Sequence, residues 1–186
     1  MGVAGLLLTG GASRRLGQDK GALVLAGTTE SLARRTARLL ASVAEPAVEV
    51  GPGFSGLPAR REDPPGAGPL VAVAAGAQWL RNLGWGGAVI VVATDLPRLT
   101  AGFLAWLAGH PASRSVVPVV DGVPQTLCAR YAPADLDVAV DLAAAGRRAM
   151  RDFLEGIDWV AVAGDHDVLL DIDTPADLAR IESGSS

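Results

Sequence analysis

Six consecutive apolar residues, 88–93 (AVIVVA), restrict the fold of this chain more than any other stretch. An apolar run without the alternation of a half-exposed strand is typical of a strand that is buried on both faces. Residues 3–8 (VAGLLL) have the same character near the beginning of the chain. Strands of this kind occur in parallel sheets that helices cover, so the two runs together favour an α/β fold.

Segments with helical periodicity separate these runs from further short strands. The expected helices cover residues 31–43, 70–83, 100–108, 133–145, 147–154 and 174–181. The other expected strands cover residues 47–50, 115–120, 124–131 and 159–163. This alternation predicts an open, mostly parallel sheet with helices on both faces, in which ligands bind beyond the carboxyl ends of the strands.

The strands over 115–120 and 124–131 flank an Asp121-Gly122 turn and are expected to pair antiparallel. Pro118 lies inside the first of them and cannot donate a backbone hydrogen bond. We therefore expect Pro118 at a sheet edge or a bulge.

Length and composition exclude several classes of protein. The chain has 186 residues, of which 49% are hydrophobic and 19% charged, so it is expected to fold as one domain over 1–182 with a frayed tail at 183–186. A net charge of -4 argues against a nucleic-acid or anionic-membrane surface. Cys128 is the only cysteine, which excludes an internal disulfide. The sequence has neither a basic signal region nor an apolar stretch near ~20 residues, and we expect a cytoplasmic protein.

Two adjacent glycines and a group of cations follow the first strand. Gly10 and Gly11 leave backbone N–H groups accessible, while Arg14, Arg15 and Lys20 supply positive charge, a combination that suits a phosphate group. The spacing matches neither the Rossmann dinucleotide fingerprint nor the P-loop. On charge pattern alone, a solvated surface loop explains these residues equally well.

The order of residues 8–20, L-T-G-G-x-S-x-R-L-G-x-D-K, resembles the signature loop of the MobA-like nucleotidyltransferases. Thr9 and Leu16 stand where that family usually has Ala and Met. The resemblance implies the family's Rossmann-like three-layer α/β/α sandwich, which is the nucleotide-diphospho-sugar transferase fold. It also implies catalytic roles for Arg15 and Lys20. The residues of this loop that it assigns to nucleotide binding are Leu8, Thr9, Gly10, Gly11, Arg15 and Lys20.

Asp95 follows the buried 88–93 strand and precedes Leu-Pro, so it is expected at the same sheet edge as the glycine loop. A turn or capping role is a common alternative for an aspartate at such a position. A nucleoside triphosphate binds as its Mg²⁺ complex, and Mg²⁺ prefers one or two carboxylates together with water and phosphate oxygens. The match to the family's D-x-P motif implies that Asp95 holds Mg²⁺, binds the nucleotide and takes part in catalysis.

Asp171 and Asp173 alternate along an extended segment, which directs both side chains to one side. They are candidates for a second metal or second-substrate contact. A helix N-cap followed by Pro175 explains the Asp173-Thr174-Pro175 triplet equally well. Guanylyltransferases of the family often carry asparagines here, whereas the D-I-D-T-P form resembles the cytidylyl relatives.

Two further segments resemble substrate-facing parts of the family. The R-E-D-P-P-G-A-G-P-L stretch assigns Asp63 to the nucleotide pocket, although a plain turn is an equal alternative. The P-Q-T-L-C-A-R-Y stretch assigns Gln125 as a polar contact, and Tyr131 as a wall, for the second substrate.

The function that the resemblance implies is transfer of GMP from Mg-GTP to the terminal phosphate of molybdopterin, with release of pyrophosphate. The alternatives are CTP as the donor, a sugar phosphate as the acceptor, and a non-catalytic nucleotide- or cofactor-binding module. The partners implied are GTP or CTP, the molybdopterin cofactor and, in transient contacts, the apoproteins of molybdoenzymes.

Overall fold

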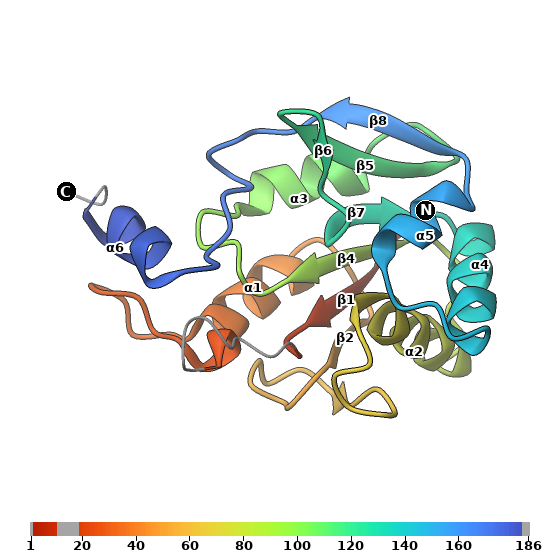
Figure 1. Ribbon diagram of the computed structural model, residues 1–186, viewed down its shortest axis with the longest axis horizontal. Helices are drawn as coiled ribbons and strands as arrows, with labels where there is room; N and C mark the ends of the chain where they lie inside the picture. Colours follow the sequence, from red (N-terminus) through yellow and green to blue (C-terminus); the bar gives the residue numbers. More distant parts are fainter. Residues whose placement is uncertain (1, 11–18, 184–186) are drawn as a thin grey trace.

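The computed structural model describes residues 2–10 and 19–183. Over these residues the strands form one sheet in the order β3-β2-β1-β4-β7-β5-β6, with β8 beside β5 (Figure 1). The strands are β1 (Ala4–Leu8), β2 (Ala47–Val50), β3 (Ala59–Arg60), β4 (Val89–Ala93), β5 (Ser115–Val120), β6 (Val123–Pro124), β7 (Cys128–Tyr131) and β8 (Trp159–Ala163). The pairs β1–β2, β1–β4, β2–β3 and β5–β8 are parallel, so the expectation of a mostly parallel sheet is confirmed.

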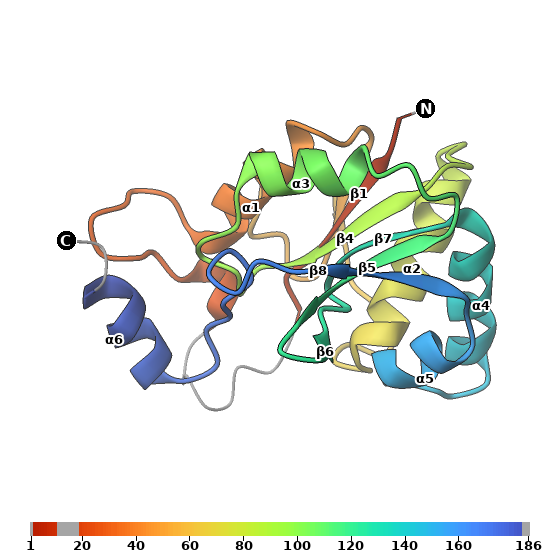
Figure 2. The same cartoon turned by 90° about the horizontal axis from the view of Figure 1, so that it is seen from above.

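Helices cover both faces of this sheet, which confirms the three-layer sandwich. Figure 2 shows α1 (Leu32–Ala41) and α3 (Ala101–Ala108) on one face. On the other face lie α2 (Pro69–Asn82), α4 (Pro133–Ala144) and α5 (Met150–Glu155). The last helix, α6 (Pro175–Ser183), stands apart from the layers at the side of the sheet near the loop before α1.

The central strands are apolar throughout because each face packs against its own helix layer. Leu6 belongs to the core beneath α2 and α4, whereas the next residue, Leu7, belongs to the core beneath α1 and α3. A third and smaller cluster joins the segment before α1 to the end of the chain through Leu23, Leu32, Ile172 and Ile181.

The hairpin at Asp121-Gly122 is confirmed, but of the two positions expected for Pro118, the sheet edge is wrong. Asp121 and Gly122 have φ angles of 49° and 80°, as a tight two-residue hairpin turn requires. β5 has neighbours on both sides, so Pro118 is not at an edge. It lies where the partner of β5 changes from β7 to β6, and its carbonyl accepts a hydrogen bond from the Gln125 backbone at 2.8 Å. Because the partner of β5 changes at this position, the absence of an N–H group on Pro118 does not cost the sheet a hydrogen bond.

The parallel register brings three chain segments together at one edge of the sheet. β1 lies between β2 and β4, and its last residue, Leu8, aligns with Val50 and with Ala93. Thr9, Gly51 and Thr94, the residues that follow these three strands, therefore lie side by side. The residues of the candidate active site lie at this edge of the sheet.

Two further findings concern the C-terminal end of the chain and the hydrophobicity of its helices. α6 includes Ser183, so that residue of the expected tail is helical, and residues 184–186 lie outside the described part. Within 2–10 and 19–183, none of the helices combines the length and the hydrophobicity that crossing a lipid bilayer requires.

Candidate active site

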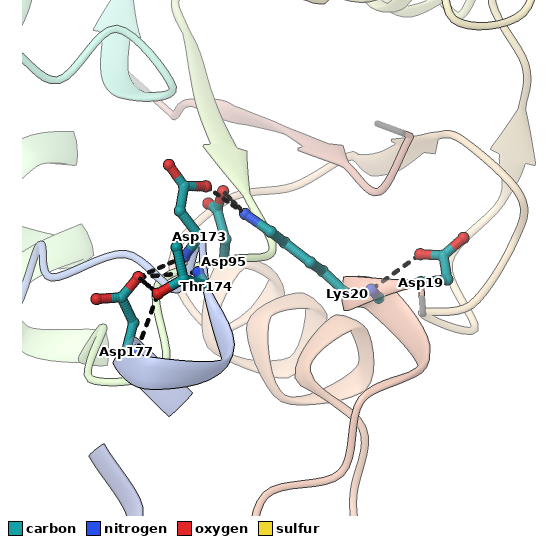
Figure 3. Close-up of polar contacts among 7 residues, drawn as sticks. Asp19, Lys20, Asp95, Asp173, Thr174 and Asp177 are labelled. Atoms are coloured by element: carbon teal, nitrogen blue, oxygen red, sulfur yellow. Dashed lines mark hydrogen bonds and ion pairs between the residues drawn. The ribbon is translucent and has the colours of Figure 1, made fainter. Parts of the chain in front are cut away.

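Lys20 and Asp95 meet at the carboxyl edge of the sheet, as their positions in the sequence predicted. Lys20 begins the short 3-10 helix η1 (Lys20–Ala22), and the carboxylate of Asp19 caps that helix by accepting a 3.1 Å hydrogen bond from the Gly21 backbone. From there the Lys20 ammonium donates to Asp95 Oδ2 at 3.3 Å and to Asp173 Oδ1 at 2.7 Å (Figure 3). The three side chains come from three separate segments and form one ion cluster.

The C-terminal segment enters this cluster through the backbone. Ile172 donates its N–H to the Asp95 carbonyl at 3.0 Å, and its side chain is fully buried. Asp171 and Asp173, on either side of Ile172, are exposed, as the alternation of an extended segment predicts. The hydrogen bond between Ile172 and Asp95 therefore positions the Asp171 and Asp173 carboxylates near the end of β4.

The cap of α6 uses other side chains than Asp173. The Thr174 hydroxyl accepts from the Asp177 backbone at 3.2 Å, while Asp177 Oδ2 accepts from the Thr174 backbone at 2.9 Å (Figure 3). This reciprocal pair is a capping box. Thr174 is therefore the residue of the triplet that caps α6. The Asp173 carboxylate binds Lys20 instead.

Charge governs the protonation of this cluster. Partial burial acts to lower the pKa of Lys20, but its hydrogen bond to Asp173 and the charges of Asp95 and Asp173 outweigh that effect and raise the pKa. Desolvation, followed by the nearby charges of Asp173 and Asp95, raises the pKa of Asp171. Among the described residues, three carboxylates thus act on one ammonium, and this part of the site carries an excess of negative charge.

The donor set suits a hard divalent cation. Asp95 and Asp173 direct carboxylate oxygens at one point, the Lys20 ammonium, so both face the same space. Within the described residues, no group of three or more histidine, cysteine, aspartate or glutamate side chains is arranged to hold a metal by itself. Two carboxylates suffice for Mg²⁺ when phosphate oxygens and water complete its coordination, so these residues fit a metal that arrives with a nucleotide.

On the other side of β1, a buried carboxylate fixes the start of the glycine loop. Glu49 of β2 is fully buried and accepts hydrogen bonds from the Thr9 hydroxyl, from the Gly53, Phe54 and Ser55 backbones and from the Ser55 hydroxyl. Burial acts to raise the pKa of Glu49, but these hydrogen bonds outweigh it and the pKa is lowered. Gly51 allows this approach, because a Cβ atom there would lie 2.0 Å from the Thr9 hydroxyl.

The loop between β3 and α2 places a second carboxylate near the glycines. Glu62 is 7% exposed, and its Oε1 accepts a hydrogen bond from the Gly66 backbone at 2.8 Å. Its two oxygens lie 3.6 and 3.7 Å from the point where a Cβ atom of Gly10 would be. Asp63, the residue chosen from the sequence, is exposed, and its side chain has no hydrogen bond or ion pair to any other described residue.

The remaining predicted residues divide into three groups. Leu8 and Thr9 are buried at the end of β1, and Gly10 is exposed beside them. Gly11 and Arg15, and with them Arg14, lie outside the described residues. Gln125 bonds the Val123 carbonyl of its own hairpin at 3.2 Å and does not join the Lys20 cluster.

Tyr131 does not form a substrate wall. Its side chain is fully buried, and its hydroxyl donates to the Thr126 carbonyl at 2.7 Å. Since β7 is a central strand, Tyr131 faces the core between the sheet and α5, where it packs on Phe153 with ring centroids 5.0 Å apart.

A cavity of about 420 Å³ lies between the β6–β7 segment and α5. Its volume is in the range of small-molecule pockets. Its lining residues are Pro124, Thr126, Met150, Arg151, Leu154, Glu155 and Trp159. Thr126 connects it to the site, because the next residue, Leu127, accepts a backbone bond from Ala93 two positions before Asp95.

Glu49 and Glu62 are the residues that sequence reasoning missed. For Glu49 a signal existed, because a carboxylate in the short AVEV strand of a parallel sheet is buried and needs several donors. For Glu62 the sequence offered no clear signal, since its burial depends on how the loop folds back through Gly66.

Comparison with known proteins identifies a family over most of the chain. The model of the "MobA-like NTP transferase domain" matches residues 5–166. A "Probable molybdenum cofactor guanylyltransferase" of Mycobacterium marinum is 33% identical over 187 aligned residues, which cover 95% of this chain and 91% of the relative. A protein of the same description from Mycobacterium tuberculosis is 32% identical over 167 residues, covering 86% of this chain and 83% of the relative.

Solved structures share the fold. Molybdopterin-guanine dinucleotide biosynthesis protein A from Archaeoglobus fulgidus superposes with a TM-score of 0.78 at 22% identity, covering 97% of both chains. The 2-C-methyl-D-erythritol 4-phosphate cytidylyltransferase from Thermus thermophilus gives a TM-score of 0.73 at 17% identity, covering 98% of both chains.

Proposed function

This chain belongs to the MobA-like NTP transferase family and is a nucleotidyltransferase, and within that activity we propose that it transfers GMP from GTP to the terminal phosphate of molybdopterin. The observation that carries the proposal is the ion cluster of Lys20, Asp95 and Asp173 at the carboxyl edge of the sheet. Relatives described as guanylyltransferases of the molybdenum cofactor, at about one-third identity, support the choice of substrates.

The reaction needs no nucleophilic side chain. An oxygen of the acceptor phosphate attacks the α-phosphorus of GTP, the bond from that phosphorus to the β-phosphate oxygen breaks, and pyrophosphate leaves with the electron pair. Both reactants are polyanions, so the main barrier is the repulsion between them and the charge that builds in the transition state. The protein therefore has to supply positive charge and orientation.

Lys20 supplies the charge from the protein side. Its side chain is 16% exposed, which keeps water from screening the ammonium, and its raised pKa keeps it protonated. When the triphosphate enters the site, its oxygens replace the carboxylates as acceptors of hydrogen bonds from the Lys20 ammonium. Asp95 and Asp173 would then hold Mg²⁺, which supplies Lewis-acid stabilisation of phosphate charge. Asp19 and η1 orient Lys20 throughout.

We place the acceptor on the side of the β6–β7 segment. The 420 Å³ cavity adjoins that segment, and Trp159, Met150 and Leu154 give it an apolar lining that suits a flat heterocycle. Gln125 lies between two of its lining residues, Pro124 and Thr126, so the stretch assigned to the second substrate borders this space. A cytidylyl transfer is the second candidate, favoured by the D-I-D-T-P form of residues 171–175.

Pyrophosphate release tests the proposal. The protein is incubated with Mg²⁺, molybdopterin and each nucleoside triphosphate in turn, with a matched reaction that contains a chelator in place of Mg²⁺. We expect release with GTP and little with CTP, and none in the chelated reaction. Release with CTP alone would move the assignment to the cytidylyl reaction. Nucleotide binding without release from any donor would contradict the transferase mechanism and favour a binding module.

A further inference from the structure

We propose that Glu62 selects guanine, by accepting hydrogen bonds from the N1–H and 2-amino groups of the base. The proposal rests on the proposed function only in that the donor is a nucleoside triphosphate bound across the end of β1. It assigns the choice between GTP and CTP, which the glycine loop and the ion cluster leave open, to a single side chain.

The first observation is that Glu62 is largely buried and accepts few hydrogen bonds from the described residues. Only 7% of the residue is exposed, yet among the described residues its carboxylate accepts one hydrogen bond, from the Gly66 backbone at 2.8 Å. Glu49, the other buried carboxylate of this edge, accepts five. Buried carboxylates are normally satisfied by several donors, because their desolvation is costly. Glu62 therefore has acceptor capacity that a ligand can use.

The second observation is the direction of the side chain. Both carboxylate oxygens lie at van der Waals distance, 3.6 and 3.7 Å, from the point where a Cβ atom of Gly10 would be. Gly10 itself is exposed, so a glycine at this position leaves open the space that the carboxylate faces. A ligand that lies on the backbone of Gly10 meets Glu62 directly.

The third observation is the position of Glu62 relative to the ion cluster. Asp95 follows β4, on one side of β1, whereas Glu62 follows β3, on the other side of β1, and its carboxylate lies beside the Gly10 end of β1. A carboxylate repels phosphate, so a nucleotide with its phosphates at Lys20 presents its uncharged end to Glu62. The ribose hydroxyls stay within a few bonds of the α-phosphate, whereas the far edge of the base reaches across β1.

The fourth step is the chemistry of the bases. An ionised carboxylate only accepts hydrogen bonds, through two oxygens side by side. Guanine offers two adjacent donors, N1–H and the 2-amino group, on its pairing edge. Cytosine and adenine present an acceptor nitrogen beside a single amino group, and uracil presents one N–H between two carbonyls. Guanine is the base that matches this acceptor pair, and the other bases leave a carboxylate oxygen facing an acceptor.

Calorimetric titration in the presence of Mg²⁺ tests the proposal without the acceptor. The ligands are GTP, inosine triphosphate, which lacks the 2-amino donor, dideoxy-GTP, which lacks both ribose hydroxyls, and CTP. For the wild-type protein we expect GTP to bind roughly 10-fold more tightly than inosine triphosphate, as one hydrogen bond to a charged group contributes. In Glu62→Gln we expect the GTP affinity to fall roughly 10- to 100-fold and the preference over inosine triphosphate to disappear.

Two controls separate base recognition from other effects. The ratio of GTP to dideoxy-GTP affinity should be the same in Glu62→Gln and wild type, and this ratio compares two ligands on one folded protein. Glu45→Gln makes the same chemical change at an exposed position at the opposite end of β1, where the Glu45 backbone bonds Val3, and should change neither ratio.

The outcomes that overturn the inference are distinct from those that overturn the function. An unchanged preference for GTP over inosine triphosphate in Glu62→Gln, or a change confined to the dideoxy-GTP ratio, removes base recognition by Glu62 and leaves nucleotidyl transfer intact. Tighter binding of CTP than GTP by the wild type also overturns the inference and the guanylyl assignment. A wild-type protein that binds none of the four triphosphates overturns the proposed function itself.

Discussion

The two sides of β1 use carboxylates in opposite ways. On the β4 side, Asp95 and Asp173 have side chains that are 28% and 56% exposed and meet a lysine. On the β2 side, Glu49 and Glu62 are almost completely buried, and their described hydrogen bonds come from backbone N–H and hydroxyl groups. The same sheet edge therefore combines an electrostatic half, open to charged ligands, with a rigid half built on hydrogen bonds.

This difference indicates where stability and where activity should be lost on mutation. Ions that water can reach contribute little to folding, but they act strongly on a bound polyanion. A buried carboxylate with a full donor set, such as Glu49, holds its loop in place, and its removal leaves several donors unpaired. Changes in the electrostatic half are therefore expected to reduce catalysis and to leave folding almost unchanged, whereas loss of Glu49 should mainly reduce stability.

The largest expected effect is on the electrostatic half. Lys20→Ala and Asp95→Ala should each reduce pyrophosphate release about 100- to 1000-fold, the range for loss of one transition-state donor. The free energy of unfolding in urea should stay close to wild type. Arg114→Ala removes a surface ion pair to Asp158, 2.6 Å away and outside the site, and should leave release unchanged. Turnover near the wild-type rate in folded Lys20→Ala would remove the catalytic role of that residue.

The second effect belongs to the hydrogen-bonded half. Glu49→Gln replaces an acceptor of five hydrogen bonds with an amide that has one acceptor oxygen. We expect the free energy of unfolding to fall by about 1–3 kcal/mol, as for buried donors left unpaired. Glu30→Gln, at an exposed ion pair with Arg38, is the matched change and should have almost no effect. Equal stability of the two variants would mean that the Glu49 network does not support the fold.

Gly10→Ala sharpens the contrast at the boundary between the halves. The added Cβ would meet Glu62 at ordinary contact distance, so the stability should not change. The methyl group would occupy the space above β1, and we expect GTP affinity to fall roughly 10-fold, the effect of one methyl-sized group in a binding pocket. Calorimetry together with thermal unfolding checks both parts. Loss of stability with retained affinity would show that the glycine serves the fold instead.

The smallest effect concerns pH. The pKa of Asp171 is raised in the folded protein, so its ionised form is less favourable there than in the unfolded chain. Asp171→Asn should therefore increase stability at neutral pH. The gain should shrink as the pH falls through the raised pKa and vanish below the ordinary value of 3.8, where the carboxyl is protonated in both states. Denaturation curves without Mg²⁺ at several pH values measure it, and a gain that persists in acid would contradict this origin.

Sequence patterns predicted the fold where local and global preferences agree. The continuous apolar runs became β1 and β4, and the helices expected from residues 31 and 100 are α1 and α3, whose N-terminal caps are Ser31 and Thr100. The edge position expected for Pro118 was wrong because the partner of a strand can change along its length, which no local pattern records.

The site was predictable only in its charged half. Lys20 and Asp95 were expected together because both follow strands of a parallel sheet, and Lys20 Nζ lies 3.3 Å from Asp95 Oδ2. The burial of Glu62 and Tyr131 depends on contacts with Gly66 and Phe153, which are set by tertiary packing. Side-chain direction in a loop or on a central strand is decided by those contacts, so a motif alone placed Tyr131 wrongly.

The small cluster of Leu23, Leu32, Ile172 and Ile181 has a consequence for motion. It joins α6 and its leading segment to the rest of the protein, and it has far fewer members than either main core. Segments held by few apolar contacts open locally at a lower free energy than the whole protein unfolds. Amide protons of α6 should therefore exchange with deuterium sooner than those of β1 and β4. Each such opening would carry Asp173 away from Lys20 while the sheet stays closed.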